Sequence, residues 1–146
     1  FYHYAECGLD NVYLSNGFHF IETLHGRAVS INDIDGLHKA IGLHLITSKK
    51  ELSGKEIRFL RDEMHMSQAT LGSLLGVGEQ TVLRWEKGKT EIPRPTEVLL
   101  RLLFREYIHN QDGNISGLLK QIANLENALH EKMFFVATKQ GWQASA

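Results

Sequence analysis

The segment SQATLGSLLGVGEQTVLRWEKG, residues 67–88, holds two short helical patterns with only a few residues between them. Ser67 is a good N-cap for the first helix, and Gly76 is suited to the left-handed conformation that ends a helix. The second helix fits residues 79–87. Because so short a turn makes the two helices cross steeply, a small residue is needed where they touch, and Gly72 provides it. The segment therefore predicts a steeply crossed pair of helices.

The second helix has an apolar face and a polar face. Val82 and Trp85 are expected to turn inward, which leaves Gln80 and Arg84 one turn apart on the opposite face. Gln and Arg are the side chains that hydrogen-bond base edges bidentately in the major groove, Gln to adenine and Arg to guanine. Polar residues on an outer helix face are usually only solvated, so the pattern alone leaves both interpretations open.

Other polar residues extend this candidate surface. A helix N-terminus and flanking basic side chains can bind phosphate groups. The complete set of candidate DNA-binding residues is Gln68, Glu79, Gln80, Thr81, Arg84, Lys87, Lys89 and Arg94. The formal net charge is −1, but residues 49–94 carry nine basic and seven acidic side chains, whereas residues 1–48 carry two and five. This modest concentration of positive charge favours a polyanionic partner at the helix pair.

The stretch SQATLGSLLGVGEQTVLRWEKGKTEIP resembles the helix-turn-helix of the phage repressor/Cro family, also called the Xre family. The shared positions are Ser67, Gln68, Leu71, Gly72, Leu75, Gly76, Val77, Val82, Arg84, Trp85, Glu86, Gly88 and Pro93. The resemblance covers residues 54 to about 108. It implies a DNA-binding domain whose contacts include the residues matching Gln68, Glu79, Gln80 and Arg84.

Two acidic residues of this segment need separate interpretations. Many relatives carry a neutral side chain where this sequence has Glu79, which would repel phosphate or accept a hydrogen bond from a cytosine amino group. We expect Glu86 to neutralise Lys89 or Arg58 and Trp85 to lie in the core, and we assign neither Glu86 nor Trp85 to DNA.

Residues before the helix pair predict a small β module. NVYLSNGFHFIET is rich in aromatic and β-branched residues, with Ser15 to Gly17 as a turn signal. HFIETLHGRAVSI predicts a hairpin of 19–24 and 27–31 that closes around His25-Gly26. A helix with Asp33 as its N-cap follows, and its apolar stripe begins at Ile34.

The fold class is therefore expected to be α+β. Residues 1–46 form a small β-hairpin and helix module, and residues 47–53 form a polar linker. An all-α helix-turn-helix domain of about five helices follows, with residues 54–110 as its DNA-binding part. Ser53 and Glu56 predict a capping box, and Pro95 fits the first turn of a later helix. Residues 111–146 are expected to contain a helix over 115–132. The tail MFFVATKQGW is expected to be a last strand or a segment ordered by a partner, and the whole region to serve dimerisation or partner contact.

The β module raises the question of a metal site. Cys7 and five of the eight histidines lie in the first 44 residues. A small β module before a helix-turn-helix resembles the MqsA-type (YgiT-like) antitoxins, in which two Cys-x-x-Cys pairs hold a structural zinc. With one cysteine this four-thiolate site cannot form within the chain, and a mixed site of His3, Cys7 and later histidines has no recognisable ligand spacing. We therefore expect no metal and no cofactor, with hydrophobic packing replacing the zinc.

Several classes of protein are disfavoured. No apolar run approaches the ~20 residues of a membrane-spanning helix, no signal peptide is visible, and a single cysteine fits a reducing cytoplasm. Acidic neighbours disfavour a reactive Cys7 thiolate, and there is no glycine-rich phosphate loop or framed pair of carboxylates. We therefore expect a cytoplasmic protein that is not an enzyme.

The preferred functional hypothesis is a sequence-specific transcriptional regulator, acting as a repressor. As a homodimer on a palindromic operator in double-stranded DNA, it would place helix 79–87 in the major groove, with half-sites ~34 Å apart. Helix 95–108 is apolar on more than one face, which suits either a twofold mate or cover by helix 115–132. An alternative is an antitoxin whose N-terminal module binds a toxin while the helix-turn-helix autoregulates the operon. A third is a scaffold that has lost DNA binding, suggested by the near-neutral charge and Glu79.

Overall fold

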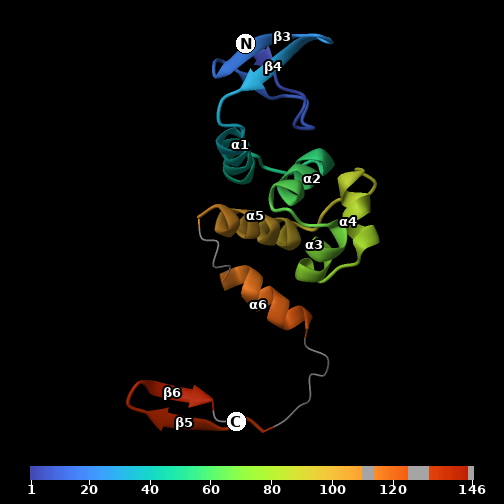
Figure 1. Cartoon of the computed structure of the whole chain (residues 1–146). Coiled ribbons are helices and arrows are strands. Elements are labelled where there is room, and N and C mark those ends of the chain that lie inside the picture. Colours follow the sequence, from blue (N-terminus) through green and yellow to red (C-terminus); the bar gives the residue numbers. More distant parts are fainter. Residues whose placement is uncertain (110–113, 125–131, 145–146) are drawn as a thin grey trace.

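The computed structural model describes residues 1–109, 114–124 and 132–144. Its elements in chain order are β1 (Tyr2–His3), β2 (Tyr13–Leu14), β3 (Phe18–Thr23), β4 (Gly26–Ile31), α1 (Ile34–Ser48), α2 (Gly54–Glu63), α3 (Gln68–Leu75), α4 (Glu79–Glu86), α5 (Arg94–His109), α6 (Asn114–Ala123), β5 (Phe135–Thr138) and β6 (Gly141–Ala144). The helices form the middle of the molecule, with one β-hairpin at each end (Figure 1). The α+β class is confirmed. Within the described ranges, no helix is both long and apolar enough to span a bilayer.

The centre of the core lies between α2, α3, α4 and α5. Ile57 and Leu60 of α2 are buried, and Leu100 and Phe104 of α5 pack in the same cluster. The predicted capping box starts α2, because Ser53 accepts from the Glu56 amide while the Glu56 carboxylate accepts from the Ser53 amide. Helix α5 begins one residue before Pro95, which occupies its first turn as expected.

Helix α1 belongs physically to this helical body. Asp33 caps it as predicted, and its buried positions lie toward its C-terminal end, whereas Ile34 is 46% exposed. Gly42 touches the Phe104 ring so closely that an added Cβ would lie 2.2 Å from it. The helix therefore packs against α5 through a contact that only glycine permits.

The polar segment 47–53 is held to the helices. Leu52 is buried, and Arg101 of α5 donates to the carbonyls of Ile46 and Lys50. Arg94 also donates to the Lys50 carbonyl, at 2.8 Å. The segment expected as a linker is thus anchored, while the division of the chain into domains at these boundaries stays a prediction.

The predicted N-terminal hairpin forms, with its turn shifted by one residue. Strands β3 and β4 pair antiparallel from Phe18↔Ile31 to Thr23↔Gly26, so Leu24 and His25 form the two-residue loop. The Thr23 hydroxyl explains the shift, because it donates to the Gly26 carbonyl and accepts from the His25 amide. Hairpin closure at His25-Gly26 was therefore wrong by one position.

The β module is joined to the helices by side chains. Leu9 is 3% exposed and belongs to the main apolar cluster. The Tyr4 hydroxyl lies 2.7 Å from Nε2 of His38 in α1, and Nδ1 of the same ring lies 2.5 Å from Glu63 in α2. This chain of hydrogen bonds crosses from the first loop to two helices.

The C-terminal region differs from its prediction in two ways. Helix α6 ends at Ala123, and the rest of the predicted helix over 115–132 includes residues 125–131, which lie outside the described part of the chain. The tail forms a two-stranded hairpin, β5 with β6, where a single strand or a partner-ordered segment was expected. Gly141 at positive φ allows the tight turn after Gln140 that pairs the two strands.

Candidate nucleic-acid interface

The turn between α3 and α4 is set by its glycines. The Ser67 hydroxyl accepts from the Thr70 amide at 3.0 Å and caps α3. Gly76 ends the helix in the left-handed region, at φ 74°. A Cβ on Gly72 would lie 2.7 Å from the Val77 carbonyl oxygen, so the turn passes directly over the first helix. The expected small residue at 72 is thus explained by contact with the backbone of the turn.

Helix α4 is anchored along one face only. Val82 and Trp85 are 0% and 3% exposed, as expected for core residues. Gln80 and Arg84 are exposed on the opposite face, and no described residue hydrogen-bonds to either side chain. The two side chains are therefore available to an outside ligand.

Glu79 lies in the first turn of α4, where a negative charge is favourable. The N-cap of this helix is Gly78, which has no side chain to satisfy the first amides. A carboxylate in the first turn stabilises a helix by interacting with its partial positive charge. Glu79 therefore has a structural role in the free protein in addition to either interpretation made for DNA.

An ion pair fixes the end of α4 to α2. Arg61 donates from Nε and Nη2 to the two oxygens of Glu86, at 2.7 and 3.0 Å, and from Nη1 to the Met66 carbonyl. The Glu86 side chain is 4% exposed and the hydrogen bond to it raises the pKa of Arg61. Glu86 was expected to neutralise Lys89 or Arg58; its partner in the structure is Arg61.

Gln68 takes part in the same network. Its Nε2 donates to Oε1 of Glu86 at 3.0 Å, so the first residue of α3 is held against the end of α4. The amide nitrogen has a second hydrogen, which leaves one donor for a phosphate. Sequence reasoning missed the role of Arg61, because nothing in the sequence links an arginine to a glutamate 25 positions away.

The remaining candidates differ in how far they are engaged. Lys87 and Lys89 are exposed, and Thr81 is half-buried. Arg94 is exposed but donates to the Lys50 carbonyl and pairs with Glu97 at 3.3 Å. The structure thus gathers most of the candidates around α4 and places Arg94 at the start of α5, partly occupied by contacts within the chain.

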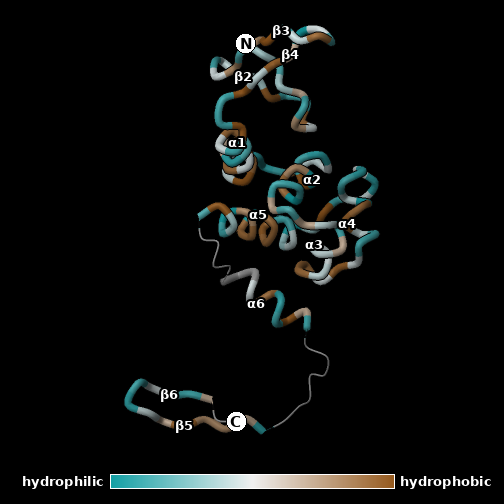
Figure 2. The backbone as a smooth tube through the Cα atoms, viewed as in Figure 1, coloured by the Kyte–Doolittle hydropathy of each residue, from teal (hydrophilic) through white to brown (hydrophobic). Residues whose placement is uncertain are grey.

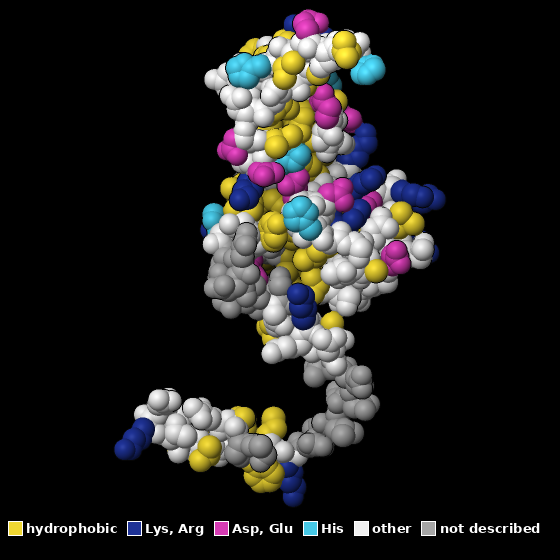
Figure 3. Space-filling view, in the orientation of Figure 1, with side chains coloured by type: hydrophobic (Ala, Val, Ile, Leu, Met, Phe, Trp, Pro, Cys, Tyr) yellow, Lys and Arg dark blue, Asp and Glu magenta, His cyan; other side chains and the backbone are white. Residues whose placement is uncertain are grey.

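Basic side chains gather over α2 and α4 on one side of the molecule (Figure 3). Arg58 of α2 is also basic, and its side chain is 68% exposed although it lies 3.7 Å from Asp62. Gly54, at the start of α2, would clash with the Glu86 carbonyl if it carried a Cβ, so the start of α2 touches the end of α4. Positive charge therefore continues from the outer face of α4 onto α2.

The candidate metal ligands are engaged in ordinary contacts. His3 donates from Nε2 to the Asp10 carbonyl at 2.7 Å and stacks on Tyr13. The Cys7 thiol donates to the Tyr4 carbonyl. In the part of the chain that the structure describes, no cluster of three or more His, Cys, Asp or Glu side chains is arranged to hold a metal ion.

Comparison with known families agrees with this geometry. Residues 57–100, from within α2 to the first half of α5, match a family model described as Helix-turn-helix, which supports the resemblance to the Xre type. Such domains bind DNA, and the match supports a DNA-binding regulator. Searches of curated proteins and of solved structures found no match. The resemblance of the N-terminal module to MqsA-type antitoxins is not confirmed.

Proposed function

We propose that the protein is a sequence-specific, homodimeric transcriptional repressor that reads the major groove with α4. One observation carries the proposal: Gln80 and Arg84 are exposed and unengaged by described residues, on a helix whose other face is held by Val82 and Trp85. A base-reading side chain must be free, whereas the helix that carries it must be fixed. Helix α4 meets both conditions.

The contacts divide into those that read bases and those that bind the backbone. Gln80 suits the adjacent donor and acceptor of adenine, and Arg84 the two acceptors of guanine. Lys87 and Lys89, with the free donor of Gln68, suit phosphates on either side of the groove. Thr81, Glu79 and Arg94 complete the proposed set, and each is expected to contribute less to the free energy of DNA binding.

A dimer follows from the small size of the reading surface. Helix α4 has eight residues, so one copy reaches only a few base pairs. Helix-turn-helix proteins increase specificity by binding two half-sites ~34 Å apart on a palindromic operator. Bound there, the dimer would exclude other proteins from the site and repress transcription in the cytoplasm without a cofactor or catalytic step.

Selection of bound DNA from a random pool, with the purified full chain at low salt, tests the proposal directly. Enrichment of a palindromic motif is the expected result, and failure to enrich any motif would overturn it. Arg84→Ala should then cost ~1–3 kcal/mol at one base position and relax specificity there. Its matched control, Lys89→Ala, should weaken specific and random DNA alike and lower the salt slope by about one.

A second candidate function is an antitoxin that also autoregulates its operon. The observation in its favour is the exposure of apolar side chains on the N-terminal hairpin, where Ile21 and Leu24 are 48% and 102% exposed and Phe20, although Arg27 lies 3.7 Å over its ring, is 49% exposed. Monomeric proteins rarely leave such residues grouped on a small module unless a partner covers them. Co-expression with the product of the adjacent reading frame, followed by co-purification, tests this alternative.

A further inference from the structure

The exposed large apolar side chains are concentrated at the two ends of the chain. They are Phe1, Tyr13, Phe20, Ile21, Leu24 and Ile34 in the N-terminal part, Val98 and Leu102 on α5, and Leu118, Ile122, Met133, Phe134, Phe135, Val136 and Trp142 in the C-terminal part. Residues 35–97, all of which are described, contribute none. Figure 2 shows hydrophobic stretches in both terminal hairpins as well as in the helices. Apart from Val98 and Leu102 of α5, the exposed large apolar side chains of the described residues thus lie toward the two ends.

The C-terminal part cannot be a stable unit by itself. We define the C-terminal arm as residues 114–124 and 132–144, which contain α6 and the hairpin of β5 and β6. Each strand of the hairpin has four residues, and none of the arm's described side chains is buried. A two-stranded hairpin of this length is at best marginally stable in water. An ordered arm therefore requires another surface to cover it.

Helix α6 also indicates that the arm requires another surface to cover it. It packs against α3 and α5, and Leu119 contacts the main apolar cluster. Leu118 and Ile122, which lie one turn apart on the same side, remain 56% and 54% exposed. The apolar face of the helix is therefore wider than the surface that the described residues of its own chain provide.

Charge distinguishes the two ends. The C-terminal region 114–146, which contains the arm, carries Lys120, Lys132 and Lys139 against Glu126 and Glu131, a net charge of +1. The N-terminal module, defined here as residues 1–33, carries four acidic side chains and one arginine. Apolar surfaces of opposite charge favour contact with each other over contact with their own kind. The two ends are thus complementary in charge and alike in hydrophobicity.

We propose that the C-terminal arm of one copy docks on the N-terminal module of a second copy, and that the second copy does the same in return. The occupant of each surface is thus a copy of this chain. The two ends lie far apart within one molecule (Figure 1), so contact between copies satisfies both surfaces. Reciprocal exchange closes the assembly as a twofold dimer. The inference rests on the dimer of the proposed function and specifies its interface.

Three aromatic side chains near and in the C-terminal hairpin supply a large part of the area that a stable dimer needs. A standard interface buries ~800 Å² per partner, and an aromatic side chain contributes ~150–250 Å² when fully buried. Phe134, Phe135 and Trp142 are 63%, 57% and 75% exposed, so these three side chains alone offer a large share of that area. The exposed aliphatic residues of α6 add to it.

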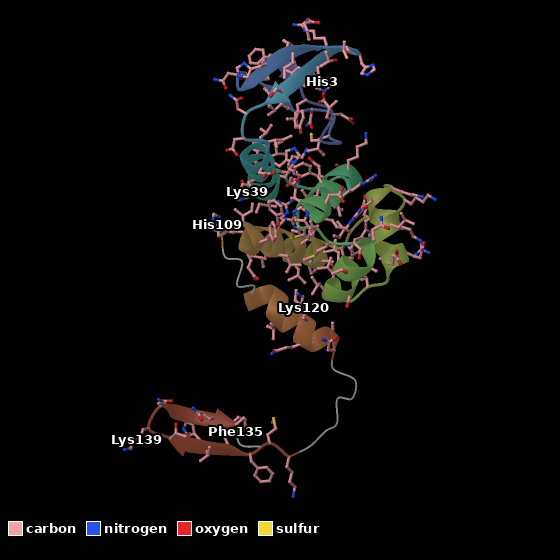
Figure 4. The ribbon with its side chains drawn as sticks, in the orientation of Figure 1. His3, Lys39, His109, Lys120, Phe135 and Lys139 are labelled. Atoms are coloured by element: carbon pink, nitrogen blue, oxygen red, sulfur yellow. The ribbon has the colours of Figure 1, made fainter. Side chains whose placement is uncertain are left out.

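Backbone geometry is compatible with this docking. Each hairpin is a separate two-stranded sheet among the described residues, so its edge strands have unpaired backbone groups. Tyr2 packs on Phe18 across one face of the N-terminal hairpin, while Ile21 and Ala28 face each other on the open side. Edge-to-edge addition would join the hairpins into one intermolecular sheet. Lys139 lies at the turn of the arm, where it can reach an acidic module (Figure 4).

The molar mass in solution tests the proposal. Light scattering of the full chain should give twice the 16.6 kDa of one copy. Trp142→Lys should raise the dimer dissociation constant at least about tenfold, as expected for loss of an aromatic anchor. The matched control is Val98→Lys, an exposed apolar residue outside both ends, which should leave the mass unchanged. Far-ultraviolet circular dichroism checks that both variants fold.

Three outcomes of this measurement overturn the proposal. The first is a monomer at concentrations at which the wild-type chain binds its motif. The second is dissociation by Val98→Lys but not by Trp142→Lys, which would place the interface on α5. The third is growth beyond a dimer with concentration, which would indicate open head-to-tail assembly.

Carbodiimide cross-linking of mixed ¹⁴N- and ¹⁵N-labelled copies identifies the surfaces. Lys132 or Lys139 should couple to Glu6 or Glu22 in peptides of hybrid isotope content. Lys55 and Asp10, 3.0 Å apart within one copy, provide the reaction control and should give no hybrids. Arm-to-module peptides without hybrids would show that each arm binds its own chain, and absence of such peptides beside a working control would also overturn the proposal.

These experiments separate the interface from the proposed function. A chain that enriches a DNA motif but stays monomeric overturns the interface and leaves base reading by α4. A chain that forms hybrid cross-links between arm and module but enriches no motif overturns the DNA function and leaves the interface.

Discussion

The two tryptophans show two different ways in which an apolar side chain can be placed. Trp85 is 3% exposed beneath α4, and Trp142 is 75% exposed on the C-terminal hairpin. Trp85 belongs to a cluster that also holds Val82 and Leu100, whereas no described residue covers Trp142. The first tryptophan is explained by the fold of one chain. The second requires an explanation outside it.

The same contrast applies to the elements that carry them. Helix α4 exposes polar side chains because its apolar residues are already buried, so its outer face is free for DNA. The hairpin of β5 and β6 exposes apolar side chains because none of the residues that the structure describes covers them. An exposed residue is therefore informative only together with what anchors the element on which it lies.

The largest expected effect comes from replacing the two tryptophans in turn. Trp85→Ala should lower the free energy of unfolding by about 3–5 kcal/mol, because it leaves a cavity beneath α4. Trp142→Ala should change it by less than about 0.5 kcal/mol at concentrations at which the chain is monomeric. Urea unfolding at low protein concentration measures both. Similar changes in the free energy of unfolding for the two variants would show that the two tryptophans do not differ in their contribution to the fold.

The ion pair beneath α4 should give the next largest effect. Glu86→Ala leaves the Arg61 charge without its partner, and should cost about 3 kcal/mol. Joint replacement by Arg61→Met and Glu86→Leu should recover most of that loss, because apolar packing replaces a buried pair at little cost. The single and double variants are compared by thermal unfolding. A double variant as unstable as the single would show that the pair contributes through something other than charge burial.

Gly72 and Gly117 compare the packed helix pair with the C-terminal arm, and the expected changes in stability are smaller. Gly72→Ala should destabilise the chain by about 1–2 kcal/mol, because a clash with the Val77 carbonyl outweighs the gain in helix propensity. Gly117→Ala in α6 meets no atom within 4 Å, so it should be neutral or stabilising by up to ~1 kcal/mol. Unfolding midpoints measure the difference. Equal effects would mean that the turn yields to the added methyl group.

The smallest expected effect concerns the ion pair that joins the β module to α2. Lys55 and Asp10 form an ion pair whose side chains are 61% and 79% exposed. A double-mutant cycle with Lys55→Ala and Asp10→Ala should give a coupling energy of about 0.2–1 kcal/mol, which salt should reduce. A larger or salt-independent coupling energy would show that this ion pair stabilises the fold more than exposed ion pairs usually do.

The helical part was predictable from the sequence because its signals are local. A capping box at Ser53 and a left-handed glycine at 76 fix the ends of helices without reference to distant residues. The burial of Val82 and Trp85 follows from helical periodicity, and that in turn predicts the free face of α4. The helix pair and the exposure of Gln80 and Arg84 could therefore be inferred from the amino-acid pattern alone.

The remaining features depend on contacts that are distant in sequence. The partnership of Arg61 with Glu86 and the anchoring of segment 47–53 by Arg101 follow from the packing of helices, which periodicity does not specify. A shift of one residue in the N-terminal turn came from a single threonine hydroxyl. The second C-terminal strand was missed because the hairpin has no buried face to give its residues a pattern.

The anchored segment 47–53 also determines how the molecule tumbles. A free polar linker would let α1, together with the strands that precede it, reorient separately from the remaining helices, each part with the short rotational correlation time of a small body. Arg94 and Arg101 instead clamp the Lys50 carbonyl, and Leu52 is buried beneath the chain. Residues 1–109 should therefore relax in ¹⁵N NMR experiments as one elongated rigid body. A partner bound to the hairpin of β3 and β4 should then lengthen the rotational correlation time of α4 as well.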